Sequence, residues 1–201
     1  MKRKIDRRTF YTRSVIKDSF LELLRKKPFP KVNVTAICKQ ADITRATFYV
    51  HYKDIYDLLD AVLDDALQIS ETTGTADQMI QMILQAGQEE DTIAFIKENY
   101  MLLPICQRIA DEPKYRQLFL DEQLTSYILR FIFSREKDNI VPLFQNEFHL
   151  NKSMAENLYL FLVSGSFAVN QHHHWKKDDE WFQIQSMLLH FLQQGFQEFK
   201  A

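Results

Sequence analysis

Residues 43–54 (ITRATFYVHYKD) bring together an arginine, two threonines, two tyrosines, a histidine and a lysine. Arg45 can form a forked pair of hydrogen bonds with a guanine edge or a phosphate, and Thr47 can offer a hydroxyl to a base or a methyl group to thymine. Tyr49 and His51 can donate hydrogen bonds to phosphate oxygens, which position a protein on a duplex without reading its sequence. This combination of residue types is typical of a surface that binds nucleic acid.

Charge is distributed unevenly along the chain. Residues 1–56 hold 14 of the 25 lysines and arginines but 5 of the 27 acidic residues, so this segment carries +9. The rest of the chain holds 11 basic and 22 acidic side chains, and the net charge is −2. Such a split favours an anion-binding segment joined to one that does not bind anions. Lys53 and an N-terminal arm are expected to add phosphate contacts; the arm consists of Lys2, Arg3, Lys4, Arg7 and Arg8.

Helical signals precede the cluster. From Asp6 to Lys27 apolar residues recur at every fourth position, and Pro28 ends the pattern. Phe29 is expected to lie in the core. Asn33 is a good N-cap for a short second helix, VTAICKQA.

A brief turn separates this second helix from a third. Asp42 tolerates left-handed backbone geometry, and Thr44 can cap a helix that begins near Arg45. Two short helices joined in this way predict a helix-turn-helix, whose second helix can enter the major groove while Phe48 faces the core. The residues expected to contact DNA are Asn33, Thr44, Arg45, Thr47, Tyr49, His51, Lys53, Lys4 and Arg8.

The segment VTAICKQADITRATFYVHYKDIYDLLDAV resembles the signature of the TetR/AcrR (tetracycline-repressor-like) family of bacterial transcription regulators. Matching positions run from Tyr11 to Val62, and the most specific are Ile37, Ala41, Ile43, Thr47, Phe48, Tyr49, His51, Tyr52 and Leu58. The resemblance implies a three-helix DNA-binding head and a variable helical body that binds a ligand and dimerises. It implies a ligand-responsive regulator, most often a repressor that a small-molecule effector releases from a palindromic operator.

The chain departs from the family pattern at three positions. Asp42 stands where glycine is frequent, Val50 where a basic residue is frequent, and Ile55 where lysine is frequent. Lys53 and the N-terminal arm are therefore expected to compensate for lost phosphate contacts.

The composition favours an all-α fold, because 46% of the residues are hydrophobic and there are only 4 glycines and 5 prolines. We expect about nine to ten helices, with a helix-turn-helix DNA-binding domain over residues 1–56 and an effector-binding and dimerisation domain over residues 57–201. A helix from about Asp54 to Ser70 should connect them, and residues 72–77 should form a linker. The acidic side chains of this connecting helix are expected to turn away from DNA: Asp57, Asp60, Asp64 and Asp65.

The body is expected to begin with an amphipathic helix, ADQMIQMILQAGQ, with Met79, Ile80, Ile83 and Leu84 buried. Pro104 predicts a kink or break near residues 100–103. A further helix is expected from Pro113 to Arg135, residues 139–150 are ambiguous, and Asn151 should cap the next helix.

The broken helix leaves room for a small apolar or aromatic effector. Aromatic side chains at helical spacing more often fill a core, so that reading stays open for each candidate. The candidate ligand-binding residues are Phe95, Tyr100, Met101, Phe119, Tyr127, Phe131, Phe161 and Trp175.

The last two predicted helices are the candidates for a homodimer interface. The helix over residues 154–175 is apolar nearly all round in its middle, and the helix over residues 180–199 is also rich in apolar residues. A helix buried on both faces needs a partner beyond its own chain, so we expect an intermolecular four-helix bundle. The expected interface residues are Leu158, Leu162, Gly165, Val169, Ile184, Leu188 and Phe191.

Other classes of function find less support. Apolar runs fall short of the roughly 18–20 residues of a membrane span, and the N-terminus lacks a signal-peptide pattern, so a cytoplasmic protein is expected.

Cys38 and Cys106 are expected to be buried, inert thiols, with redox sensing as the alternative. Consecutive residues of a helix point about 100° apart, so His172, His173 and His174 fit a polar helix end better than a metal site.

No cofactor and no metal are expected. The sequence shows no Gly-rich phosphate loop, nucleophile elbow or metal-spaced His/Glu pair, which argues against an enzyme. The remaining alternative is a co-activator that keeps a TetR-like head and recruits a partner protein.

Overall fold

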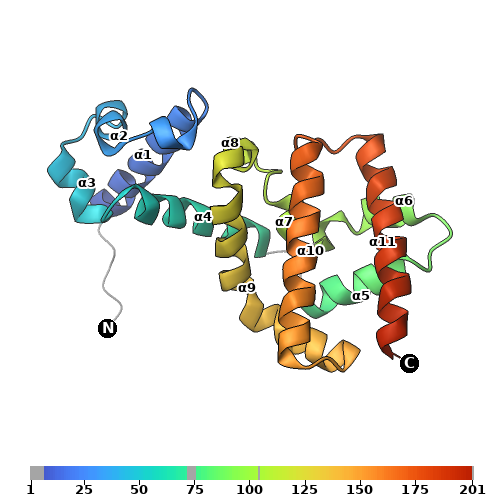
Figure 1. The fold of residues 1–201 in the computed structure, drawn as a ribbon. Helices are drawn as coiled ribbons and strands as arrows, with labels where there is room; N and C mark the ends of the chain where they lie inside the picture. Colours follow the sequence, from blue (N-terminus) through green and yellow to red (C-terminus); the bar gives the residue numbers. More distant parts are fainter. Residues whose placement is uncertain (1–6, 72–75, 104, 201) are drawn as a thin grey trace.

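The computed structural model describes residues 7–71, 76–103 and 105–200. Over these ranges the regular structure is helical, with eleven α-helices and three short 3-10 helices, which confirms the predicted all-α class. In Figure 1 a small N-terminal head and a larger body are joined by the long helix α4 (Ile55–Glu71). None of the described helices is long and apolar enough to cross a bilayer.

The head consists of α1 (Arg7–Leu24), the 3-10 helix η1 (Phe29–Lys31), α2 (Val34–Gln40) and α3 (Arg45–His51). Its core is formed by side chains that are fully or almost fully buried: Ile16, Phe20, Phe29, Ile37, Phe48 and Tyr52. The expected core position of Phe29 is confirmed. Because apolar residues from all of these elements share one core, α2 and α3 are held rigidly against α1.

The body wraps long helices around a second part of the core. In Figure 1, α10 stands between α9 and α11, and it packs along α9, while α11 packs on α5 and α6. Its elements are α5 (Ala76–Ala86), α6 (Thr92–Glu98), η2 (Tyr100–Leu102), α7 (Ile105–Arg108), α8 (Arg116–Leu120), η3 (Glu122–Leu124), α9 (Thr125–Phe148), α10 (Lys152–His172) and α11 (Asp179–Lys200).

The predicted single helix from Pro113 to Arg135 is wrong. α8 ends at Leu120, and α9 begins at Thr125. Between them Asp121 takes an extended backbone (φ −77°, ψ 100°), and its carboxylate accepts a hydrogen bond from the N–H of Gln123 at 3.1 Å. A capping aspartate satisfies N–H groups at a new helix start, so the chain breaks here and restarts.

The ambiguous stretch 139–150 is mostly helix, because α9 runs on to Phe148 through Pro142. Proline removes one helical hydrogen bond, but the flanking residues Val141 and Phe144 are buried in the core. Their burial keeps the segment helical despite that loss. The predicted N-cap at Asn151 is confirmed, since its Oδ1 accepts from the N–H of Met154 at 3.0 Å.

Helix α5 is buried on more than the predicted stripe. Ile80 is buried as expected, but Met79, Ile83 and Leu84 are half-buried, and Met82 and Ala86 are buried instead. The reason is that α5 lies between α9 on one side and α11 on the other. Of the expected linker, residues 72–75 lie outside the described residues, and α5 already begins at Ala76.

The predicted interruption near residues 100–103 is confirmed. α6 ends at Glu98, the 3-10 turn η2 follows, and α7 begins only at Ile105. Pro104 itself lies outside the described residues.

The expected burial of Cys38 is also confirmed, and burial raises the pKa of its thiol, which leaves less of the reactive thiolate. The side chain of Cys106 is outside the described part of the chain.

Candidate nucleic-acid interface

The start of α2 is fixed by Asn33. Its backbone is extended, and its Oδ1 accepts a hydrogen bond from the N–H of Ala36 at 2.9 Å. This contact satisfies one of the N–H groups that a helix leaves unpaired at its first turn. Asn33 is therefore an N-cap, as predicted, and its side chain is exposed at the start of the helix-turn-helix.

The turn between α2 and α3 is built by Asp42 and Thr44. Asp42 adopts the predicted left-handed backbone, with φ 51°. The N–H of Ile43 then donates to the carbonyl of Cys38 at 3.0 Å, which closes the end of α2. The hydroxyl of Thr44 accepts from the N–H of Thr47 at 3.1 Å and so caps α3.

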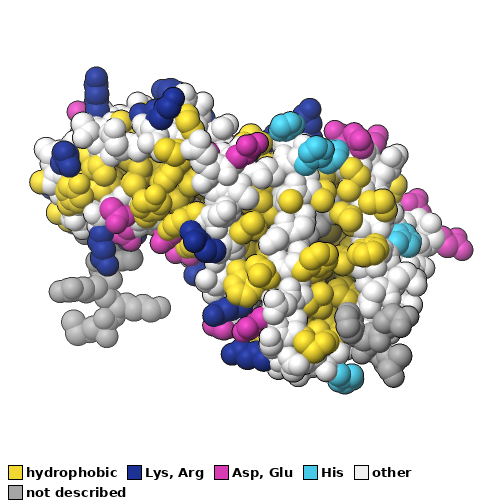
Figure 2. All heavy atoms as spheres, viewed as in Figure 1, with side chains coloured by type: hydrophobic (Ala, Val, Ile, Leu, Met, Phe, Trp, Pro, Cys, Tyr) yellow, Lys and Arg dark blue, Asp and Glu magenta, His cyan; other side chains and the backbone are white. Residues whose placement is uncertain are grey.

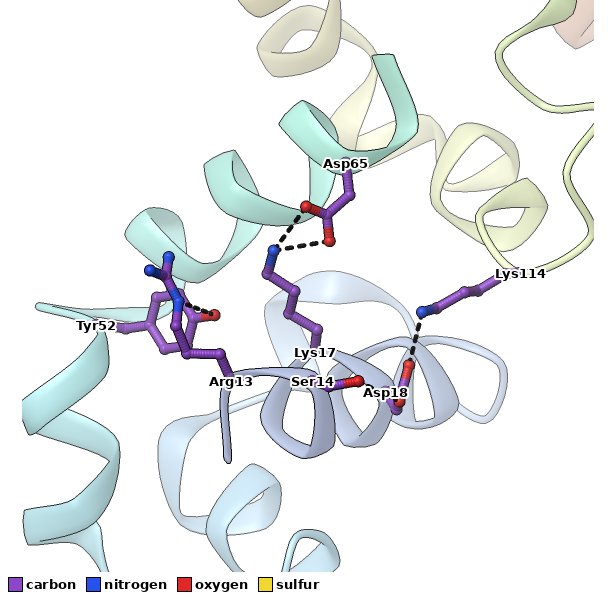
Figure 3. Close-up of polar contacts among 7 residues, drawn as sticks. All are labelled: Arg13, Ser14, Lys17, Asp18, Tyr52, Asp65 and Lys114. Carbon is purple, nitrogen blue, oxygen red and sulfur yellow. Dashed lines mark hydrogen bonds and ion pairs between the residues drawn. The ribbon is translucent and has the colours of Figure 1, made fainter. Parts of the chain in front are cut away.

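Two buried rings fix the rotation of α3 about its axis. Phe48 and Tyr52 are buried, with ring centroids 5.8 Å apart. The Nε–H of Arg13 on α1 donates to the hydroxyl of Tyr52 at 3.4 Å (Figure 3). Because one face of α3 is held to α1 in this way, the opposite face must point away from the head.

One exposed flank of α3 carries Arg45 and Tyr49. An Nη2–H of Arg45 donates to the Tyr49 hydroxyl at 3.2 Å, and the guanidinium carbon lies 5.9 Å from the ring centroid. This hydrogen bond raises the pKa of Arg45, so the group is charged at any physiological pH. The contact fixes both side chains one turn apart on a helix that could face a phosphate backbone.

Hydroxyl and imidazole groups lie on the flank of α3 away from Arg45. The hydroxyls of Thr44 and Thr47 are 3.0 Å apart, and Thr47 and His51 are half-buried. Lys53 is exposed in the loop after α3, where its backbone N–H donates to Asp57 at 2.8 Å.

The expected N-terminal arm lies only partly within the described residues. Arg8 is exposed at the start of α1. Lys4 lies outside the described residues, as do Lys2 and Arg3. Asn33 lies at the start of α2, and the other predicted DNA-contacting residues lie along α3 and at its two ends.

Two outward residues of α3 were missed from the sequence. Ala46 is exposed, and Val50 is 77% exposed. The signal was available, because both lie two positions from the buried Phe48 and so on the opposite side of a helix. The sequence predicts that Ala46 and residues 48–50 divide between packing and exposure, and Val50 also departs from the family pattern.

Known proteins resemble the same part of the chain. Residues 18–62, which include all of α2 and α3, match the family described as bacterial regulatory proteins, tetR family. The head of the chain is therefore similar to the tetR family over these residues. The match confirms the predicted family on the segment that carried the resemblance.

Two known proteins that are similar to this chain differ in how much of it they match. YxbF of Bacillus subtilis (strain 168), an uncharacterized HTH-type transcriptional regulator, is 34% identical over 62 residues, which are 30% of this chain but only 16% of the relative. The crystal structure of the TetR family repressor AlkX from Dietzia sp. strain DQ12-45-1b, implicated in biodegradation of n-alkanes, shares 17% identity. It aligns with a TM-score of 0.43 over 92% of this chain and 97% of that chain.

The candidate ligand-binding residues are spread over several parts of the body. Phe119 and Trp175 are buried against each other with ring centroids 5.7 Å apart, and the indole N–H of Trp175 donates to the carbonyl of Phe119 at 3.1 Å. Met101 and Phe161 are 52% and 64% exposed. Phe95, Tyr127 and Phe131 are half-buried among core side chains.

Tyr100 and Trp175 do meet at one hollow, with a volume of about 660 Å³. Its charged lining includes Asp111, whose carboxylate accepts from the Tyr100 hydroxyl at 2.5 Å, and Lys177, which donates to the carbonyl of Gln107 at 2.6 Å. Burial raises the pKa of both Tyr100 and Asp111. The hollow is thus more polar than the apolar cavity expected from the sequence.

The three consecutive histidines lie at the C-terminal end of α10. The rings of His172 and His173 are 6.1 Å apart and nearly perpendicular, while His174 is exposed with a left-handed backbone (φ 50°). Among the described residues no group of three His, Cys, Asp or Glu side chains is arranged to hold a metal ion.

Proposed function

We propose that this protein is a dimeric DNA-binding transcription regulator, which represses by occupying a palindromic operator and leaves it when a small-molecule effector binds the body. The observation that carries the proposal is the orientation of α3. Phe48 and Tyr52 hold one face in the head, so Arg45 and Tyr49 are presented outward. This geometry matches a recognition helix in a major groove.

The charge distribution supports the same function. Residues 1–56 carry +9, and the acidic residues that follow along α4 are engaged within the chain. Asp57 accepts from the Lys53 backbone N–H, Asp60 from Tyr127, Asp64 pairs with Arg135, and Asp65 pairs with Lys17. The cationic partners of Asp64 and Asp65 offset the charge of these two carboxylates, which weakens the repulsion between this part of α4 and a phosphate backbone.

An exposed apolar face supports the homodimer. Leu158, Leu162 and Val169 on α10, and Ile184 and Leu188 on α11, are half-buried within the single chain. Phe161, Met187 and Phe191 beside them are 64%, 62% and 68% exposed. Figure 2 shows hydrophobic side chains gathered over α10 and α11. Large apolar patches on a soluble protein mark interaction sites.

Two glycines of this face have no packing role inside the chain. A Cβ added at Gly165 or at Gly195 would meet nothing within 4 Å. Small residues on a helix surface permit close approach of another helix, so both positions suit an intermolecular four-helix bundle. Two heads related by a two-fold axis would read half-sites about one helical turn apart, or a multiple of it.

The hollow beside Tyr100 and Trp175 is the proposed effector site. An aromatic molecule with a polar group suits its mixed lining. Effector binding would favour a spacing of the two heads that no longer fits the operator. A hundredfold loss of operator affinity needs about 2.7 kcal/mol of coupling between the two sites.

The decisive experiment is a gel-shift selection of genomic fragments with the purified full chain, followed by a salt titration. If α3 and its neighbours neutralise several phosphates, the logarithm of the affinity should fall steeply with the logarithm of salt concentration. Arg45→Ala should weaken binding, whereas Lys26→Ala, at an exposed pair with Glu22 on the far end of α1, should change it little. Absence of any salt-sensitive duplex binding would overturn the proposal and favour the partner-recruiting alternative.

A further inference from the structure

The line of α3 that points most directly away from the head is apolar. With about 100° between successive residues of a helix, Ala46 and Val50 both lie about 160° from the buried Phe48. Val50 is 77% exposed, which is more than any other large hydrophobic residue among the described parts of the chain. Head packing therefore gives no reason for a valine at this position.

Polar groups stand on the two flanks of this line and not on it. Arg45 lies on one flank, tied to Tyr49 by its 3.2 Å hydrogen bond, and Thr47 lies on the other flank near Thr44. A helix inserted with this orientation would place Val50 against the floor of the groove. Arg45 and Thr47 would then reach toward base edges or phosphates at the sides.

The chemistry of the groove floor narrows what Val50 can contact. Guanine, adenine and cytosine present hydrogen-bond donors and acceptors there, whereas thymine presents a 5-methyl group beside its O4 acceptor. An isopropyl group pressed on a donor or acceptor would leave that polar group without a partner, which is costly. Contact with a methyl group instead removes apolar surface from water on both sides.

We propose that Val50 reads the 5-methyl group of a thymine in each half-site of the operator. The inference rests on the proposed function, because it requires α3 to enter the major groove. Removing one such methyl group should weaken binding about fourfold, and removing both symmetry-related ones about fifteenfold, from the transfer free energy of one buried methyl-sized group.

The test uses deoxyuridine, which pairs like thymine but lacks the methyl group. The full chain selects its sites from a random duplex library, and each thymine of the selected site is then replaced singly by deoxyuridine. One position in each half-site should show the fourfold loss with the natural chain. Val50→Ala, which removes no core contact, should bind the thymine and uracil duplexes with equal affinity.

A matched control comes from the body. Leu160→Ala removes an exposed apolar side chain of α10, 44% exposed, and should keep the full sensitivity to the methyl group. If the chain selects a site but every uracil duplex binds as well as its thymine parent, the inference is wrong while the proposed function stands. Methyl sensitivity that persists in Val50→Ala would also overturn it. If no duplex is selected, the proposed function fails and the inference fails with it.

Discussion

The carboxylate of Asp121 in the body accepts a hydrogen bond from the backbone N–H of Phe29 in the head, at 2.7 Å and across 92 positions of sequence. A second contact also joins the body to the head, since Lys114 pairs with Asp18 of α1 at 2.8 Å (Figure 3). The head is therefore fastened to the segment around α8 and η3 as well as to α4. A change in the body could reach the DNA-binding surface by either route.

Asp121→Ala should loosen the head from the body. The variant leaves the Phe29 N–H without its charged acceptor and also removes the cap of η3, so we expect a loss of about 1–3 kcal/mol in the free energy of unfolding. Amide hydrogen exchange at Phe29 should become faster. Glu122→Ala, at the exposed neighbouring position, is the control and should leave that amide unchanged. Equal exchange rates at Phe29 in both variants would contradict the role given to Asp121.

The salt bridge between Lys17 on α1 and Asp65 on α4 should have a larger coupling energy than a salt bridge on the exposed surface. Its Nζ and Oδ2 atoms are 2.7 Å apart, and the Lys17 side chain is only 14% exposed (Figure 3). A double-mutant cycle with Lys17→Met and Asp65→Asn, followed by urea unfolding, should give a coupling energy of about 1 kcal/mol, discounted for the half-exposed aspartate.

The control cycle uses Lys26 and Glu22, which lie one turn apart on the exposed side of the head and are 59% and 49% exposed. Pairs of this kind contribute about 0.3–0.5 kcal/mol. Similar coupling energies in the two cycles would show that partial burial does not strengthen the Lys17–Asp65 contact.

The stability of the protein should depend on Tyr127 at high pH. Burial, followed by the 2.6 Å hydrogen bond to Asp60, raises the pKa of Tyr127 above its ordinary value. A group with a raised folded pKa contributes stability below its unfolded pKa, about 10 for tyrosine, and that contribution is lost as pH rises toward the folded value. Tyr127→Phe should therefore be less stable than the natural chain at pH 8, and the gap should narrow above about pH 10.

Chemical denaturation at several pH values between about 8 and 11 measures this effect. Tyr11→Phe serves as control, because that side chain is 70% exposed on α1. The Tyr11→Phe curve should run parallel to that of the natural chain. A Tyr127→Phe curve that stayed parallel over the whole range would rule out the assigned contribution.

Gly165→Leu should separate the two copies of the proposed dimer without harming the single chain. An added Cβ meets nothing within 4 Å inside the chain, and leucine is a better helix former than glycine. We expect light scattering after size exclusion to give the monomer mass of 23.9 kDa for the variant and twice that mass for the natural chain. Met101→Leu, on the exposed turn η2, should remain dimeric; a dimeric Gly165→Leu would place the interface elsewhere.

Short-range features of the head could be predicted because each depends on a few neighbouring residues. Asn33 and Thr44 cap helices through N–H groups three positions ahead, and the left-handed turn at Asp42 depends on the backbone of a single residue. Phe48 was placed in the core from helical spacing alone. The same spacing places Val50, two positions from Phe48, on the exposed side of the helix.

Body positions were harder to assign, since helical spacing shows that a side chain faces inward without showing what it meets. Phe119 and Trp175 satisfy the pattern of a cavity wall but fill the core against each other. Tyr100 and Trp175 border the hollow only because the α6–α8 segment and the α10–α11 connection come together there.

The amino-acid sequence by itself determined the helical class, the two capped helices and the basic front segment, because caps, periodicity and charge act over a few residues. Only the tertiary structure decided where α8 ends and which side chains join head to body. The reason is physical: the Asp121 carboxylate that ends one helix and starts the next also binds Phe29, a partner 92 positions away. No local pattern contains a contact of that range.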